Sequence, residues 1–81
     1  MIVKLLLFAA AKEIAGSQHV ELSLDEPCTV GRLKIALTAQ CPDLAALTDR
    51  SAFSVDQIYA NDATEIGHDA EVAMIPPVSG G

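Results

Sequence analysis

Short segments of alternating apolar and polar residues recur along this chain and predict a β-sheet. Residues 2–8 are leucine-rich and β-branched, with apolar side chains at both alternating sets of positions, which predicts a central strand covered on two sides. Residues 19–24 alternate strictly, which predicts a strand with one face in solvent. Residues 53–60 and 71–75 predict two further strands, because turn-forming residues flank them.

Two other segments have the pattern of helices. Residues 9–15 are alanine-rich and precede Gly16, which suits a left-handed C-terminal cap. A longer helix is predicted over residues 30–40, with its apolar positions on one face and Thr29 as its N-cap. Residues 42–50 form a connector with room for a helical turn. The predicted order is therefore strand, helix, strand, helix, strand, strand.

Composition and charge limit the classes of partner. A length of 81 residues leaves room for one domain, and 51% hydrophobic residues with four prolines and five glycines are typical of a globular fold. Five basic and eleven acidic residues give a formal net charge of −6, which opposes binding to nucleic acid or to an anionic membrane. The sequence has no glycine-rich phosphate loop, apolar run of membrane-spanning length or secretion signal. We therefore expect a cytoplasmic protein with reduced thiols that binds no nucleotide by itself.

The cysteines and histidines do not form a metal-binding pattern. Cys28 and Cys41 are far apart in sequence, and no Cys/His cluster accompanies them, so we expect no metal site. Both are interpreted as small core residues, since Cys41 continues the apolar face of the predicted helix. His19 and His68 are interpreted as solvated surface residues.

The C-terminal segment carries the candidate chemistry. It reads Pro76-Pro77-Val78-Ser79-Gly80-Gly81, and its two prolines cannot donate hydrogen bonds to a sheet, so the chain must leave the last strand. We predict a domain at residues 1–75 and an extended, flexible tail at residues 76–81. The two glycines lack side chains, so the carboxylate fits a channel too narrow for a Cβ atom. Gly81 is then the candidate reactive residue.

A terminal carboxylate is an anion at neutral pH and a poor electrophile, so it needs activation. The usual activated form is a mixed anhydride with AMP, and the acidic body offers no site for the ATP. An activating enzyme would have to supply that site. The alternative interpretation is an inert, frayed end, because chain termini with small polar residues are commonly disordered.

Several segments together carry a family resemblance: Lys12-Glu13 in the short helix, Thr29-Val30-Gly31-Arg32-Leu33 at the next helix start, Tyr59-Ala60-Asn61, and the stretch from Glu71 to the final PPVSGG. In these segments the chain resembles the ubiquitin-like sulfur carriers, most closely the small subunits of molybdopterin synthase (the MoaD type). The resemblance implies an α+β fold of the β-grasp (ubiquitin-like) type, with a mixed sheet of four to five strands packed on one main helix.

The resemblance also implies a reaction. Gly81 is adenylated by an ATP-using activating enzyme (MoeB type) and converted to a thiocarboxylate. The tail residues Pro76, Pro77, Val78, Ser79 and Gly80 enter the active site of the large subunit (MoaE type), in a heterotetramer. There the sulfur passes to cyclic pyranopterin monophosphate and forms the molybdopterin dithiolene. The chain is then catalytic only as the sulfur-donating subunit, and it binds no cofactor itself.

The last predicted strand offers candidate contacts with the large subunit. Val72 and Met74 alternate with Ile75, and we expect all three to contribute to the partner interface. Alternation does not decide which side of the strand is buried, so the face of Val72 and Met74 is open to interpretation as core. Relatives often carry aromatic residues before the prolines, whereas this chain has Met74 and Ile75.

Other functions share the terminal glycines. A sulfur carrier for thiamine thiazole synthesis would end in the same way, but such carriers are usually shorter and lack PPVSGG. A ubiquitin-like modifier would join Gly81 to lysines, although such modifiers commonly carry arginine where this chain has Ser79. A pure binding module with an inert tail is the remaining alternative.

Overall fold

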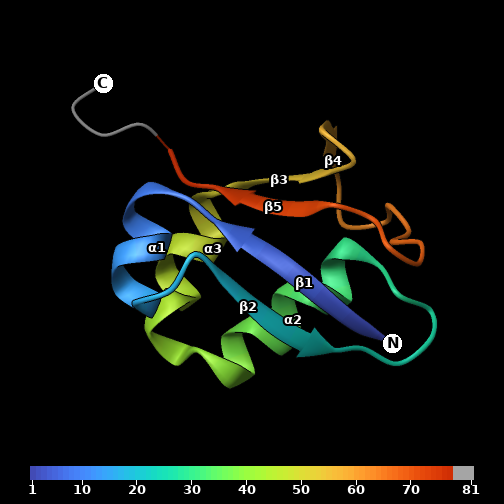
Figure 1. The fold of residues 1–81 in the computed structure, drawn as a ribbon, viewed down its shortest axis with the longest axis horizontal. Helices are drawn as coiled ribbons and strands as arrows, with labels where there is room; N and C mark the ends of the chain where they lie inside the picture. Colours follow the sequence, from blue (N-terminus) through green and yellow to red (C-terminus); the bar gives the residue numbers. More distant parts are fainter. Residues whose placement is uncertain (78–81) are drawn as a thin grey trace.

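The structure, a computed structural model, describes residues 1–77 and contains a five-stranded mixed sheet with helices packed against it (Figure 1). The elements in chain order are β1 (Ile2–Leu7), α1 (Ala9–Ala15), β2 (His19–Ser23), α2 (Val30–Gln40), η1 (Pro42–Leu44), α3 (Ala45–Arg50), β3 (Ala52–Val55), β4 (Ile58–Ala60) and β5 (Val72–Ile75). This arrangement confirms the predicted β-grasp class, with α2 as the main helix. Among the described residues, no helix has the length and apolar character needed to cross a membrane.

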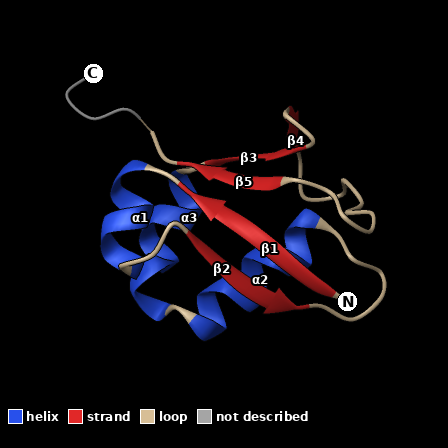
Figure 2. Cartoon of the chain, viewed as in Figure 1, coloured by secondary structure: helices blue, strands red, loops and turns tan. Residues whose placement is uncertain are grey.

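The sheet has the strand order β2-β1-β5-β3-β4, so β5 lies in its middle (Figure 2). It pairs in parallel with β1 and antiparallel with β3. The outer pairs, β1 with β2 and β3 with β4, are antiparallel. The last strand of the chain is thus held from both sides before the tail begins.

One face of the sheet packs against the helices and forms the core. The buried side chains of this face and those of the helices belong to one cluster: Val3, Leu5, Leu7, Leu22, Phe53, Val72 and Met74 from the strands, and Val30, Leu33, Leu37, Leu44 and Leu47 from the helical segments. Burial of these apolar side chains is the main stabilising contribution in a domain of this size.

The predicted helix ends are confirmed. Gly16 adopts a left-handed conformation with φ 71° after α1, and its amide donates to the carbonyl oxygen of Lys12. The Thr29 hydroxyl accepts a hydrogen bond from the Arg32 amide at 3.3 Å, which caps α2. The connector at residues 42–50 is more ordered than predicted, because η1 and α3 occupy its whole length.

The segment predicted as a single strand over residues 53–60 is instead a hairpin of β3 and β4. Asp56 and Gln57 form its two-residue turn, with φ angles of 52° and 68°. Two positive φ angles match a type I′ turn, which joins twisted antiparallel strands well. The sequence has Asp-Gln at this point and not the usual Asn-Gly or Asp-Gly, so residues 53–60 have the pattern of one continuous strand.

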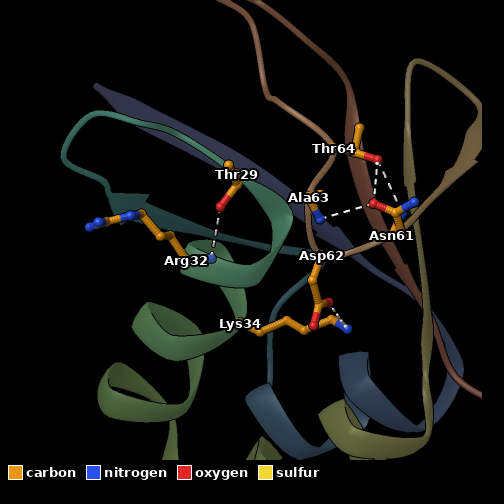
Figure 3. Close-up of polar contacts among 7 residues, drawn as sticks. All are labelled: Thr29, Arg32, Lys34, Asn61, Asp62, Ala63 and Thr64. Atoms are coloured by element: carbon orange, nitrogen blue, oxygen red, sulfur yellow. Dashed lines mark hydrogen bonds and ion pairs between the residues drawn. The ribbon is translucent and has the colours of Figure 1, made fainter.

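The loop after β4 is fastened to the start of α2 (Figure 3). The amides of Val30 and Gly31 donate to the carbonyl oxygens of Thr64 and Asp62, at 3.0 and 2.9 Å. The Lys34 ammonium is 2.7 Å from an Asp62 carboxylate oxygen, and it lies 5.2 Å from the centre of the Phe53 ring in β3. These contacts fix the otherwise irregular segment that leads to β5.

Candidate functional site

The root of the tail lies at the carboxyl end of β5, in the centre of the sheet. Ile75 pairs with Ala52 of β3, and Pro76 follows directly. Pro76, the first residue of the predicted tail, is buried, and Pro77 is exposed. The sequence-predicted site residues Val78, Ser79, Gly80 and Gly81 lie outside the described residues.

The predicted interface residues of β5 separate into two sets. Val72 and Met74 have 0% exposure and belong to the core cluster, so the prediction that they contact a partner is wrong. Strand alternation places Ile75 on the opposite face, where it is half-buried. Of the three predicted interface residues, Ile75 is the one with solvent-accessible surface.

The second face of the sheet has no helix on it among residues 1–77. The cross-strand register aligns Leu6 of β1 with Ala73 of β5, Ala73 with Ser54 of β3, and Ser54 with Tyr59 of β4. Tyr59 is 74% exposed, and Leu6 is half-buried. The sheet therefore presents a row of small and apolar side chains on its uncovered side.

Phe8 extends this face to the point where the tail leaves. It continues the strand alternation in an extended conformation, with φ −127° and ψ 156°, which places it on the side of Leu6. Its side chain is 50% exposed. The next residue, Ala9, has φ 50°, so the chain turns sharply into α1 at a conformation that is unfavourable for alanine.

We call this surface the open-face platform and define it by Leu6, Phe8, Ala52, Tyr59 and Ile75, which surround the buried Ala73. Most of this platform is not predicted by the sequence pattern, because apolar residues at both sets of positions in β1 are typical of a strand covered on two sides. Within residues 1–77, helices cover only one side of the sheet. The sequence did contain a sign of this platform. The predicted helices are too few to cover both faces of the sheet, so the apolar residues on the second face of β1 indicate a surface for a partner.

Charge is unevenly placed on the open face. Lys4 lies opposite Glu21 of β2, and Glu71 immediately precedes the residue that pairs with β1. The end of the face away from the tail is therefore charged. The end near the tail is mainly apolar and adjoins a shallow hollow of about 390 Å³ lined by Leu6, Leu7, Phe8, Ala9, Lys12 and Gln18.

The cysteines and histidines lie apart from the platform. Cys28 is buried, with its thiol 3.6 Å from the Asp25 carbonyl oxygen, which confirms it as a core residue. Cys41 is half-buried at the end of α2 and packs against the core. His19 and His68 are exposed, as predicted. Among residues 1–77, no group of three or more potential metal ligands converges.

Fold and site together define a class of protein: a small β-grasp domain that holds its last strand in the centre of the sheet and releases its C-terminal segment beside an apolar face. The chain belongs to the ThiS family, whose model matches residues 5–81. The resemblance to sulfur carriers of the molybdopterin synthase type is confirmed by its relatives.

Two curated relatives illustrate the match. The molybdopterin synthase sulfur carrier subunit of Chlamydomonas reinhardtii is 31% identical over 83 aligned positions that cover all of both chains. The subunit of the same name from Dictyostelium discoideum is 35% identical, over 96% of this chain and 94% of that one.

Solved structures share the fold. SAMP1 from Haloferax volcanii superimposes with a TM-score of 0.87 at 29% identity, over the whole of both chains. A complex of subunits 1 and 2 of the molybdopterin-converting factor from Helicobacter pylori contains a chain that superimposes with a TM-score of 0.70. At 18% identity, that second likeness concerns the fold alone.

Proposed function

We propose that this chain is the sulfur-carrying small subunit of a molybdopterin synthase and that Gly81 carries the sulfur. The observation that carries the proposal is the position of the tail root. It continues a strand paired on both sides and leaves the body beside an apolar platform that residues 1–77 leave uncovered. The family match through residue 81 and the names of the curated relatives support it.

In the proposed cycle, the Gly81 carboxylate attacks the α-phosphate of ATP on an activating enzyme and releases pyrophosphate. The resulting acyl adenylate is an electrophile. A hydrosulfide ion supplied by a donor attacks the acyl carbon and displaces AMP, which leaves a thiocarboxylate on Gly81. In these steps the activating enzyme binds the nucleotide, and the folded domain of this chain serves only as the part that the enzyme recognises.

The second half of the cycle needs the large subunit. There the thiocarboxylate sulfur bonds to a carbon of cyclic pyranopterin monophosphate, and water takes its place on Gly81, which regenerates the carboxylate. Two such transfers supply both sulfurs of the dithiolene. The precursor carries phosphate, and a body with a net charge of −6 is unsuited to binding it, so the large subunit supplies the basic residues.

The open-face platform is the proposed contact with the large subunit, with Ile75 at its centre. The curated relatives are named as sulfur carrier subunits of molybdopterin synthase, which supports an assembly with a second subunit. Covering Phe8, Leu6 and Ile75 would bury apolar surface that residues 1–77 leave uncovered, which favours association. The tail residues Pro76 to Gly80 would then be directed into the partner's active site.

Intact-mass analysis tests the proposal. After incubation with an activating enzyme, ATP and a sulfur donor, we expect one oxygen of the chain to be replaced by sulfur, with the change localised to Gly81 by fragmentation. Deletion of Gly81 should abolish the exchange, whereas Gly67→Ala, a glycine change away from the tail, should not. Absence of exchange in the intact chain would remove the carrier function.

A second candidate is protein modification, because the similar Haloferax volcanii structures are named as small archaeal modifier proteins. In that case Gly81 would form an isopeptide bond with lysine, and the same mass analysis would find conjugates. The third candidate, a carrier for thiazole synthesis, would give the same sulfur exchange. It would fail to convert cyclic pyranopterin monophosphate when mixed with the large subunit, and that assay separates the two.

A further inference from the structure

A groove between the edge of β2 and the outer side of α2 has no role in the proposed sulfur transfer. Its hollow, of about 440 Å³, is lined by Ser23, Leu24, Asp25, Arg32, Ile35, Ala36 and Ala39. Ile35 is 72% exposed and lines this hollow together with Ala36 and Ala39, so the lining has an apolar floor. The alanines beside it leave room for another side chain.

The free edge of β2 forms the other side of this groove. The Leu24 amide donates to the Met1 carbonyl oxygen, and the Leu7 amide donates to the Gln18 carbonyl oxygen. Even-numbered residues of this strand therefore bond to β1, and the backbone groups of His19, Glu21 and Ser23 point outward.

Side chains of this chain cover part of that edge. The Ser17 hydroxyl donates to the His19 carbonyl oxygen at 2.8 Å and accepts from the His19 amide at 3.4 Å. The Gln40 amide group donates to the Glu21 carbonyl oxygen at 3.1 Å. Within the described residues, nothing bonds to the outward amide of Glu21 or to either backbone group of Ser23. Ser23, with both backbone groups unbonded, lines the hollow that contains Ile35.

We propose that this groove binds an extended apolar peptide segment of a partner protein, which adds as an antiparallel strand to β2 at Ser23. One residue of the segment would exchange both backbone hydrogen bonds with Ser23, and the residue two positions further along the segment would accept from the Glu21 amide. Apolar side chains on the helix side of the segment would pack on Ile35, Ala36 and Ala39.

Charge specifies one further feature of the segment. Arg32 makes no ion pair with any described residue. Figure 3 shows its side chain pointing away from Asp62, the loop residue that pairs with Lys34. A carboxylate on the segment would meet this guanidinium at the rim of the groove. Asp25 also lines the hollow, which disfavours a longer acidic run. The preferred occupant is therefore a β-branched apolar stretch with one adjoining acidic residue.

The groove is far from the tail along the sheet. β2 runs antiparallel to β1, and β1 runs parallel to β5, so Ser23 lies at the end of the sheet opposite the tail root (Figure 1). A segment bound there leaves the open-face platform accessible. The partner in this groove can thus be present while the tail is engaged elsewhere.

NMR titration of the whole chain tests the inference. The probe is a short blocked peptide with a run of valine and isoleucine followed by one glutamate. We expect shifts of the Glu21, Ser23, Ile35 and Ala39 amides, and no binding when proline replaces a residue in the middle of the run. Shifts confined to the open-face platform, or no shifts at all, would overturn the proposal.

Three variants make the test specific. Ile35→Ser should weaken peptide binding about tenfold, whereas Ile58→Ser, an equally exposed isoleucine on the other edge strand, should leave it unchanged. Gln40→Ala frees the Glu21 carbonyl oxygen for one more hydrogen bond, so binding should tighten about two- to tenfold. A nonspecific apolar patch would not respond to Gln40→Ala, and that result would contradict strand addition. Ile35→Ser should retain sulfur exchange at Gly81, which separates this inference from the proposed function.

Discussion

The Gly31 amide donates a hydrogen bond to the Asp62 carbonyl oxygen at 2.9 Å, and a Cβ atom on Gly31 would lie only 3.1 Å from that same oxygen. The glycine therefore allows the start of α2 and the loop before β5 to approach as backbones. Its φ angle is ordinary for any residue, so the requirement is for space. This contact links the main helix to the segment that leads into the tail-bearing strand.

Replacement of Gly31 by alanine should destabilise the protein by about 1 kcal/mol, because the steric conflict with Asp62 outweighs the better helix propensity of alanine. Urea unfolding followed by circular dichroism measures the change. Gly67→Ala is the control, since nothing lies within 4 Å of an added Cβ atom at that glycine. Equal stability of Gly31→Ala and the parent protein would show that the loop shifts without cost.

Met74 should behave as a core residue. Its side chain has no exposed surface, so Met74→Ala should lower the free energy of unfolding by about 2–4 kcal/mol through lost packing and a residual cavity. Thermal and urea unfolding measure the loss. If the variant has normal stability but binds the large subunit more weakly, Met74 contacts the large subunit after all.

Phe8 should act in association rather than folding. Because its side chain is half exposed, Phe8→Ser should reduce affinity for the large subunit by at least about tenfold and change stability by less than about 1 kcal/mol. Calorimetric titration measures the affinity. Ile35→Ser removes an exposed apolar side chain from α2 and should leave this affinity unchanged. Equal effects of the two variants would argue against the open-face platform as the contact.

The cysteines should contribute to stability and not to sulfur transfer. Cys28→Ala removes a buried thiol and should cost about 1 kcal/mol, whereas Cys41→Ala should cost less because that residue is half-buried. Intact-mass analysis of the folded double variant should still show sulfur exchange. Loss of exchange in that variant would point to a persulfide step on one of these thiols.

Local signals in the sequence predicted much of the fold. Gly16 and Thr29 marked helix ends correctly, because each cap depends on conformational freedom or a hydroxyl group within a few residues. The turn at Asp56 and Gln57 was missed, since neither residue is a strong signal for positive φ angles. Pairing with neighbouring strands, which lies outside any local window, stabilises that turn.

Some features of the candidate site follow from the sequence, and others depend on the tertiary structure. The sequence by itself determined that two prolines follow β5 and that two residues without side chains stand at positions 80 and 81, which is the basis of the proposed tail chemistry. Only the tertiary structure decided which side of β5 is buried, so that Met74 is core and Ile75 lies at the surface. Alternation specifies that two faces exist, but the helices cover one of them through contacts between residues far apart in sequence.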